Sequence, residues 1–240
     1  MMTIGGTAHI SMLVATILII ALLMFIASKV SRFWQDVMIY SAPAVCMIGI
    51  LFLHLTHYGK ELDFKNFFIQ MFQVCNFNFI LLPLSLIKKN ELARQYLFMF
   101  SMFCAASTFV AYPNDVENSM WYSIVTLNFW IDHMMVVLVP MLMIATRRFK
   151  PQFKYVIWVG ICVLLYFFSA FLLNLGLNGW TFDGGSNYSF TMSPDSIMIL
   201  QPFFKWIPIP YVYLLPVWVV FVAFFYFLAF CFKNYKVEHF

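Results

Sequence analysis

Long apolar runs, each close to the length of a membrane-crossing helix, place the strongest constraint on the fold of this chain. A helix needs about 20 mainly apolar residues to cross the hydrocarbon core of a bilayer. Backbone groups in lipid must be satisfied within the segment, and these runs lack the alternation of barrel strands. The sequence therefore predicts an all-α membrane protein with seven transmembrane helices. The runs are residues 8–27, 37–57, 66–87, 96–112, 121–146, 155–176 and 211–232.

Composition leaves no room for a separate soluble domain. The 240-residue chain is 63% hydrophobic and 10% charged, whereas soluble domains carry about 25% charged residues. We therefore expect one membrane domain over residues 1–240, with its longest non-spanning segment at 177–210. The basic residues are spread over short loops, so the net charge of +4 does not indicate nucleic acid as a partner. The cysteines lack CxxC spacing, and we predict neither a metal site nor a cofactor.

The distribution of basic residues predicts how the helices are oriented. Eleven of the 14 Lys and Arg residues follow the first, third, fifth and seventh runs. Such residues favour the cytoplasmic side of a membrane. We therefore expect a multi-pass protein of the cell membrane, with its N-terminus outside and its C-terminus in the cytoplasm. Segment 177–210 would then lie outside, where its many aromatic and apolar residues favour folding over the helices.

The fifth run contains the most costly polar groups, in the stretch NFWIDHMMVV (128–137). Asp132 and His133 lie about 17 Å from the outer end of this run at the helical rise. Asn128 shares a helix face with Asp132. Ionisable groups inside spans are functional candidates by default, although hydrogen bonding between helices is an alternative role. We expect these three side chains to line a cavity in the outer half of the membrane.

Two other runs place polar groups toward the same outer region. Cys75, Asn76 and Asn78 lie in the outer half of the third run, and Cys75 is close to His133 in depth. His54 lies near the outer end of the second run, where it is expected to face the same cavity. A metal site there would need further ligands, and we expect none.

Three motifs carry a resemblance to a known family. They are QVCNFNFILLPLSLIKKN (73–90), FWIDHMMV (129–136), and the loop from NLGLNGW through SNYSFTMSP to WIPIPYVY (174–213). In these motifs the chain resembles the YwaF-type family of seven-span bacterial membrane proteins, which includes a eukaryotic branch of transmembrane acyltransferases. The resemblance covers about residues 40–230. It implies that Cys75 is the acyl-accepting nucleophile, that His133 is its partner, and that Asn174, Asn187 and Tyr188 belong to the site.

The chemistry of such a pair suits acyl transfer. A nearby imidazole stabilises a thiolate, which then attacks an ester. We therefore predict a lipid acyltransferase or acyl hydrolase that draws phospholipid from the outer leaflet, with membrane lipids as its partners. Two alternatives stay open: a lipid- or solute-binding transporter component, and a non-enzymatic subunit whose polar groups hold helices together. Besides Cys75 and His133, the predicted substrate-binding residues are His54, Asn76, Asn78, Asn128, Asp132, Asn174, Asn187 and Tyr188.

Overall fold

A computed structural model describes residues 4–56, 69, 72–87, 89–110, 120–182, 185–195, 197 and 199–238. Every regular element within these ranges is a helix, which confirms the all-α prediction. The elements are α1 (Thr7–Ala27), α2 (Arg32–Thr56), α4 (Val74–Leu86), α5 (Glu91–Tyr96), the π-helix η1 (Leu97–Ser101), α6 (Met102–Thr108), α8 (Ile124–Ala145), α9 (Phe153–Leu177), the 3-10 helix η2 (Tyr188–Phe190), α10 (Gln201–Trp206) and α11 (Leu214–Cys231).

The helices coincide with the apolar runs of the sequence. Each predicted run contains a helix within the described ranges, and α5, η1 and α6 follow one another without a break. Within the described residues, the helices α1, α8, α9 and α11 are long and apolar enough to cross a membrane, and α4 is a shorter apolar helix. These lengths indicate a membrane protein with several spanning helices, while the count of seven and the orientation stay predictions.

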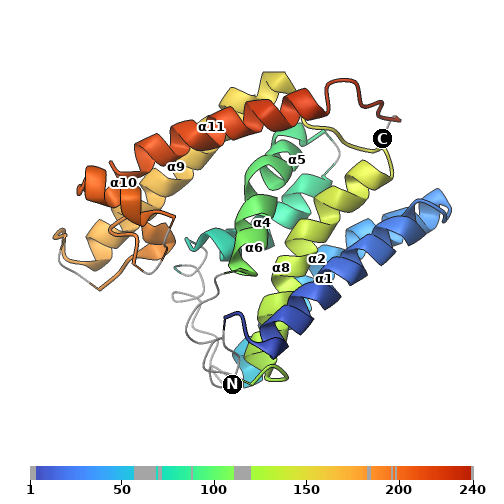
Figure 1. The fold of residues 1–240 in the computed structure, drawn as a ribbon, viewed down its shortest axis with the longest axis horizontal. Helices are drawn as coiled ribbons and strands as arrows, with labels where there is room; N and C mark the ends of the chain where they lie inside the picture. The colour runs from blue at the N-terminus through green and yellow to red at the C-terminus, as the bar shows by residue number, and fades with distance from the viewer. Residues whose placement is uncertain are drawn as a thin grey trace.

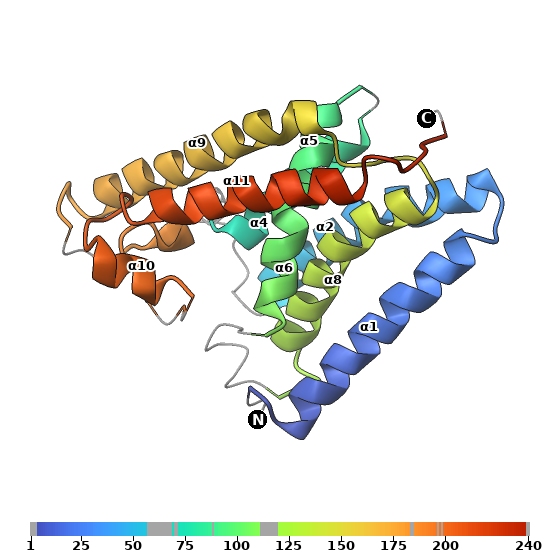
Figure 2. The same cartoon turned by 45° about the horizontal axis from the view of Figure 1, so that its top comes forward.

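The helices form two groups that flank a central pair. Helices α1, α2 and α8 pack together on one side, and α9 and α11 run side by side on the other. Between them lie α4 and the continuous α5–η1–α6 segment (Figures 1 and 2). The two groups approach each other at the end that carries the C-terminus and diverge toward the opposite end. The molecule therefore has a narrow end and a wide end.

The core of the fold surrounds η1. All five η1 residues are buried, and the segment contacts α4, α8, α9 and α11. Phe98 packs against Phe149 and Phe232, whereas Phe100 packs against Phe167 and Phe221. Large apolar side chains on α1, α9 and α11 remain exposed, as expected for surfaces that face lipid.

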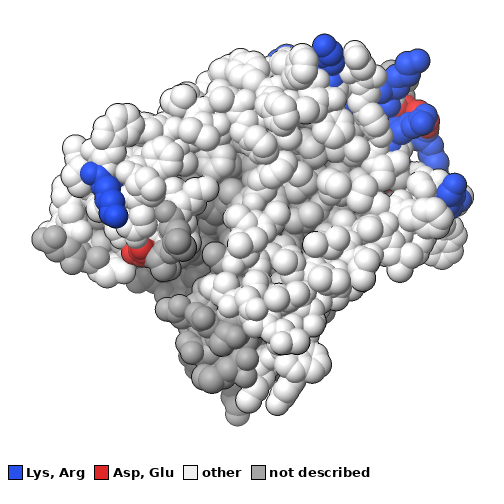
Figure 3. Space-filling model, in the orientation of Figure 1, with Lys and Arg blue, Asp and Glu red and all other residues white. Residues whose placement is uncertain are grey.

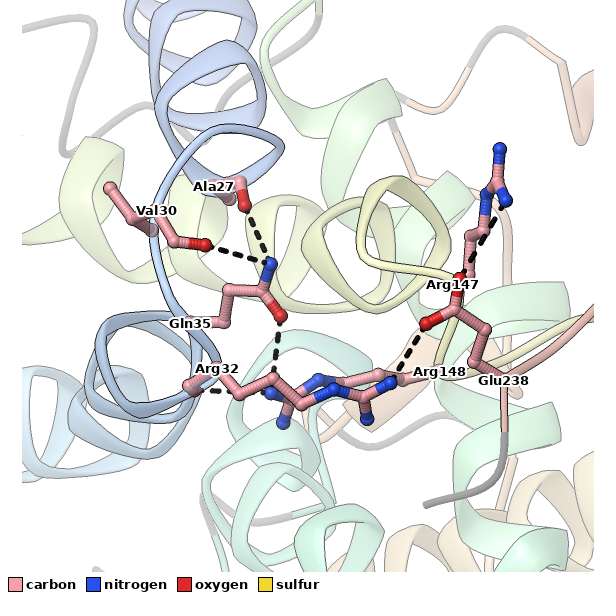
Figure 4. A network of polar contacts seen from close by, with 7 residues as sticks. All are labelled: Ala27, Val30, Arg32, Gln35, Arg147, Arg148 and Glu238. Atoms are coloured by element: carbon pink, nitrogen blue, oxygen red, sulfur yellow. Dashed lines mark hydrogen bonds and ion pairs between the residues drawn. The ribbon is translucent and has the colours of Figure 1, made fainter.

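Charged side chains gather at the narrow end, which we call the basic end (Figure 3). The buried Arg148 side chain forms an ion pair with Asp36 and donates to the carbonyl of Arg32 and to Gln35 Oε1, both at 3.2 Å. Gln35 in turn donates to the carbonyl of Ala27 at 2.9 Å. Figure 4 shows how this network joins the connection after α8 to the turn between α1 and α2.

The C-terminal tail is fixed to the same end. Glu238 pairs with Arg32 at 2.8 Å and with Arg147 at 3.6 Å (Figure 4). The Tyr235 hydroxyl donates to the carbonyl of Ile144 at 2.5 Å, and Lys150 donates to the carbonyl of Tyr235 at 2.9 Å. The tail therefore ties the end of α11 to α8 and to the start of α2.

Candidate functional site

Cys75 lies in the first turn of α4, at the end of that helix away from the basic end. Its side chain is partly exposed. No side chain caps this helix, because Gln73 at the cap position uses Oε1 to accept from the N–H of Ser189 at 3.1 Å. The first turn of a helix presents backbone N–H groups and a partial positive charge. This position favours a thiolate at Cys75, whereas burial of the sulfur among apolar neighbours opposes it.

The surroundings of Cys75 add further polar groups. The thiol of Cys104 on α6 and the hydroxyl of Tyr166 on α9 lie within electrostatic reach of Cys75. The Tyr166 hydroxyl is also 3.1 Å from the Ser189 hydroxyl. Helices α4, α6 and α9 therefore meet at this thiol, together with a segment that follows α9.

We call that segment, residues 188–191, the strap. Ser189 is buried, and its hydroxyl donates to the carbonyl of Phe72, so the strap is bound to the two residues that precede α4. Ser189 and Phe190 have φ values of 54° and 59°. Non-glycine residues in this left-handed region cost about 1–3 kcal/mol each and persist only when their surroundings hold them.

Side chains from both neighbouring helices hold the strap in this conformation. Asn174 of α9 is fully buried; its Nδ2 donates to the carbonyl of Tyr188 at 3.0 Å and to Thr191 Oγ1 at 2.8 Å, and its Oδ1 accepts from the N–H of Tyr188 at 2.9 Å. The Tyr213 hydroxyl, just before α11, donates to the carbonyl of Phe190. The strained backbone thus has its polar groups satisfied from α9 and α11.

Three residues predicted to bind substrate therefore make their contacts within this loop. Asn174 and Tyr188 bond to each other, as described. Asn187 accepts from the N–H of Met192 at 2.9 Å and donates to the carbonyl of Ser193 at 2.9 Å and to Asp195 at 2.8 Å. In this structure all three build the segment that lies on the start of α4, and their role in substrate binding stays a prediction.

His133 of α8 is buried with one ring nitrogen unused. Its Nδ1 lies 2.7 Å from the carbonyl oxygen of Phe129. A carbonyl can only accept, so Nδ1 carries the proton and Nε2 of the neutral ring is an acceptor. Nε2 is buried and has no hydrogen-bond partner within the described part of the chain. The ring packs against Phe129 and against Phe109, which follows α6. Among the described residues, Nε2 of His133 therefore keeps an unpaired acceptor lone pair.

Asp132, the next residue along the chain, has different neighbours. Its carboxylate accepts from Asn128 Nδ2 at 2.6 Å and interacts with the thiol of Cys46 on α2. Gly49 of α2 leaves space for this pair, because a Cβ added there would lie 2.4 Å from Asn128 Oδ1. Asp132 and Asn128 thus share one face of α8, as their spacing predicted, and the structure shows that this face meets α2. His133 instead contacts Phe109.

The two predicted catalytic residues, Cys75 and His133, have different neighbours in the structure. The His133 ring contacts Phe109 and Phe129, and its hydrogen bond is to Phe129. The electrostatic neighbours of Cys75 are Cys104 and Tyr166. His133 Nε2 has no hydrogen-bond partner among the described residues, so it does not bond to the Cys75 thiol.

The remaining predicted residues lie near α4 and at the end of α2. Asn78 is buried and donates to the carbonyl of Val74 at 3.3 Å, while Asn76 is half-buried. His54 lies in the last turn of α2, and its side chain is outside the described residues. Among the residues that the structure describes, no group of three or more His, Cys, Asp or Glu side chains could hold a metal ion.

Several residues of this region were missed by sequence reasoning. Tyr166 lies eight residues before Asn174 and Trp130 three residues before His133, and both spacings place a pair on one helix face. Those spacings could have drawn attention to Tyr166 and Trp130. Ser189 carries no such signal, because its role follows from the bend of the strap over α4.

Comparison with known proteins gives one result. A model of the TMEM164 family, a family of transmembrane proteins, matches residues 4–232. No curated protein and no solved structure matches the chain. Because the family match spans almost the whole sequence, the chain belongs to the TMEM164 family.

Proposed function

We propose that this protein is a membrane-embedded lipid acyltransferase or acyl hydrolase, with Cys75 as the nucleophile and His133 as the base. The observation that carries the proposal is the position of Cys75, a partly exposed residue, in the uncapped first turn of α4. Backbone N–H groups there stabilise a thiolate and, later, the oxyanion of a tetrahedral intermediate. The resemblance of the Cys75 and His133 motifs to the YwaF-type family, with its acyltransferase branch, points the same way.

In the first half of the reaction, the Cys75 thiolate attacks the carbonyl carbon of a phospholipid ester. The new S–C bond forms, the C–O bond to the glycerol oxygen breaks, and that oxygen takes up the proton given up by the thiol. The products are a thioester on Cys75 and a lysophospholipid. First-turn N–H groups of α4 are well placed to stabilise the negative oxygen in this step.

In the second half, an acceptor O–H attacks the thioester. Its proton passes to Nε2 of His133, and the C–S bond breaks with the electron pair on sulfur. His133 then releases that proton to solvent and the Cys75 thiolate takes up a proton from solvent, so that the neutral imidazole and the thiol are restored. The free lone pair of Nε2 supports this role, because a general base must have an unused acceptor in reach of the proton. A lipid alcohol as acceptor gives transfer, and water gives hydrolysis.

The proposal includes seven crossings with the N-terminus outside. The grouping of Lys and Arg at the narrow end supports a cytoplasmic position for that end. Cys75 and the strap lie toward the wide end, so the acyl donor would be a phospholipid of the outer leaflet.

One observation favours a non-enzymatic alternative. The Asp132 carboxylate is bonded to Asn128 and lies against Cys46 at the contact of α8 with α2. Polar groups used in this way hold helices together, as they would in a partner subunit without catalytic activity.

The test measures acyl transfer directly. Purified protein in nanodiscs receives phosphatidylcholine with a labelled acyl chain, and intact mass reports a thioester on Cys75. We expect Cys75→Ala to abolish both the thioester and product formation. The control is Cys231→Ala, because Cys231 is exposed at the end of α11 and its loss should leave the rate unchanged. Full product formation by Cys75→Ala would refute the proposal and favour the partner subunit.

A further inference from the structure

Two unused polar atoms lie on one face of α8. Trp130 is 4% exposed and His133, three residues later, is 8% exposed. Neither the indole nitrogen Nε1 of Trp130 nor Nε2 of His133 has a hydrogen-bond partner among the residues that the structure describes. Most buried polar side-chain atoms in native proteins are paired, and exceptions call for a ligand, a water molecule or another specific cause.

The two side chains flank the same ring. Phe109 stacks on the Trp130 indole, with ring centroids 4.8 Å apart and an angle of 22°. It meets His133 edge to face, with centroids 6.2 Å apart and an angle of 68°. The Trp130 and His133 side chains therefore belong to one aromatic cluster at the end of α6.

The cluster is fixed in place by α1. His9 Nδ1 accepts from the N–H of Gly5 at 2.9 Å, so Nε2 carries the proton and donates to the carbonyl of Phe109 at 2.6 Å. This bond holds Phe109 and with it the position of the ring between Trp130 and His133. Side chains of α1 and α8 and the residue that follows α6 therefore pack around Trp130.

The chemistry of the two atoms is complementary. An indole N–H can only donate, and Nε2 of the neutral His133 can only accept. A phosphate or carboxylate only accepts and an ammonium only donates, so each would satisfy one atom and leave the other unpaired. A hydroxyl group both accepts and donates. We infer that Trp130 and His133 form a subsite for the hydroxyl group of an alcohol.

The role of this subsite in the reaction rests on the proposed function. In that reaction the subsite binds the hydroxyl group of the acyl acceptor. Trp130 then orients the acceptor oxygen by donating to one of its lone pairs, and His133 takes the hydroxyl proton as that oxygen attacks the thioester. His133 consequently acts in the second half of the reaction, which agrees with the lack of a hydrogen bond to Cys75 in this structure. The hydroxyl can come from a lipid alcohol or from water.

The first experiment measures binding and needs no catalysis. The protein in nanodiscs is photolabelled with a diazirine-bearing hexadecanol and, separately, with the matching hexadecane. We expect the alcohol to label α8 and α6 peptides several times more strongly than the hydrocarbon does. Trp130→Phe keeps the ring but loses the N–H, so its alcohol labelling should fall to the hydrocarbon level. Trp158→Phe is the control, because Trp158 is exposed on α9, and it should label like the wild type.

The second experiment separates the two halves of the reaction. Trp130→Phe should raise KM for the alcohol about tenfold, while the rate of Cys75 thioester formation stays the same. His133→Asn keeps a donor for the carbonyl of Phe129 but lacks the base. It should accumulate the Cys75 thioester and lose about 100-fold or more in the rate of product formation, the usual effect of a general base.

Each outcome of these experiments supports or refutes the hydroxyl subsite. Equal labelling by alcohol and hydrocarbon, together with unchanged kinetics in Trp130→Phe, would overturn it. Fatty-acid release that falls in Trp130→Phe, without selective alcohol labelling, would assign the hydroxyl to water. Selective alcohol labelling in a protein that forms no Cys75 thioester would support the subsite and refute the proposed acyl transfer.

Discussion

The two ends of the molecule are held together by different kinds of polar contact. At the basic end, Arg148 and Glu238 join α2, the connection after α8 and the C-terminal tail through charged groups. At the wide end, Asn174 and Tyr213 hold the strap through neutral amide and hydroxyl groups. Salt screens exposed charges, whereas neutral hydrogen bonds in a low-dielectric setting are strong and need no counter-charge. Added salt should therefore weaken the contacts at the basic end and leave those at the wide end unchanged.

The largest effect on stability is expected from Asn174→Leu. This change removes three buried hydrogen bonds and leaves the N–H of Tyr188 without its partner. Each lost hydrogen bond costs about 1 kcal/mol, so the free energy of unfolding should fall by about 3 kcal/mol. Thermal unfolding in nanodiscs measures the loss at low and high salt. The control is Ser169→Ala on the exposed face of α9, and a loss that depends strongly on salt would contradict the comparison.

A smaller and salt-dependent effect is expected at the basic end from Arg148→Ala. The change removes the ion pair with Asp36 and the bonds to Arg32 and Gln35. Asp36 is about half exposed, so water compensates its charge in part and the expected loss is about 2 kcal/mol. The loss should shrink as salt is raised. Arg32→Ala, which alters an exposed pair with Glu238, should cost under about 1 kcal/mol.

The strap should also control access to Cys75. Ser189→Ala removes the hydroxyl that bonds to the carbonyl of Phe72 beside the start of α4. We expect a stability loss of about 1 kcal/mol and a several-fold faster alkylation of Cys75 by N-ethylmaleimide, read by mass spectrometry. Alkylation of the exposed Cys231 in the same protein is the internal control. Equal rates at Cys75 in the variant and the wild type would show that the strap does not cover the thiol.

A pH-dependent effect is expected at the tail. Burial raises the pKa of the Tyr235 phenol, with Arg147 lowering it and Glu238 raising it further to a lesser degree. A raised pKa means that the stabilisation is present while the phenol is protonated in both states, and that it is lost as pH rises above about 10. Tyr235→Phe removes the bond to Ile144 and should cost about 1 kcal/mol at neutral pH. That difference between variant and wild type should vanish in unfolding measurements at alkaline pH.

The helices were predictable because hydrocarbon thickness fixes the length of a spanning segment. Runs 8–27 and 155–176 agree with α1 and α9 within two residues at each end. The sequence also placed Asp132 and Asn128 on one face of α8, and they are bonded. These results depend only on helical geometry, which the chain carries locally.

The arrangement of the site was harder to predict, because it depends on which helices lie next to one another. Depth alone placed Cys75 level with His133, but depth says nothing about the lateral position of α4 relative to α8. Adjacent residues on a helix point about 100° apart, so Asp132 could face α2 while His133 faces Phe109. Buried and turn backbone groups need partners, and the amide of Asn174 supplies them to the strap, while that of Asn187 supplies them to Met192 and Ser193.

The π-helical segment η1 has a consequence for how the molecule can move. Its five residues are buried on every side and touch helices of both flanking groups. A helix with no lipid-facing surface cannot turn about its axis or slide without displacing closely packed aromatic rings on several neighbours, and densely packed interiors resist such shifts. We therefore expect any opening of the wide end to be a change of angle around η1, with the narrow end staying closed.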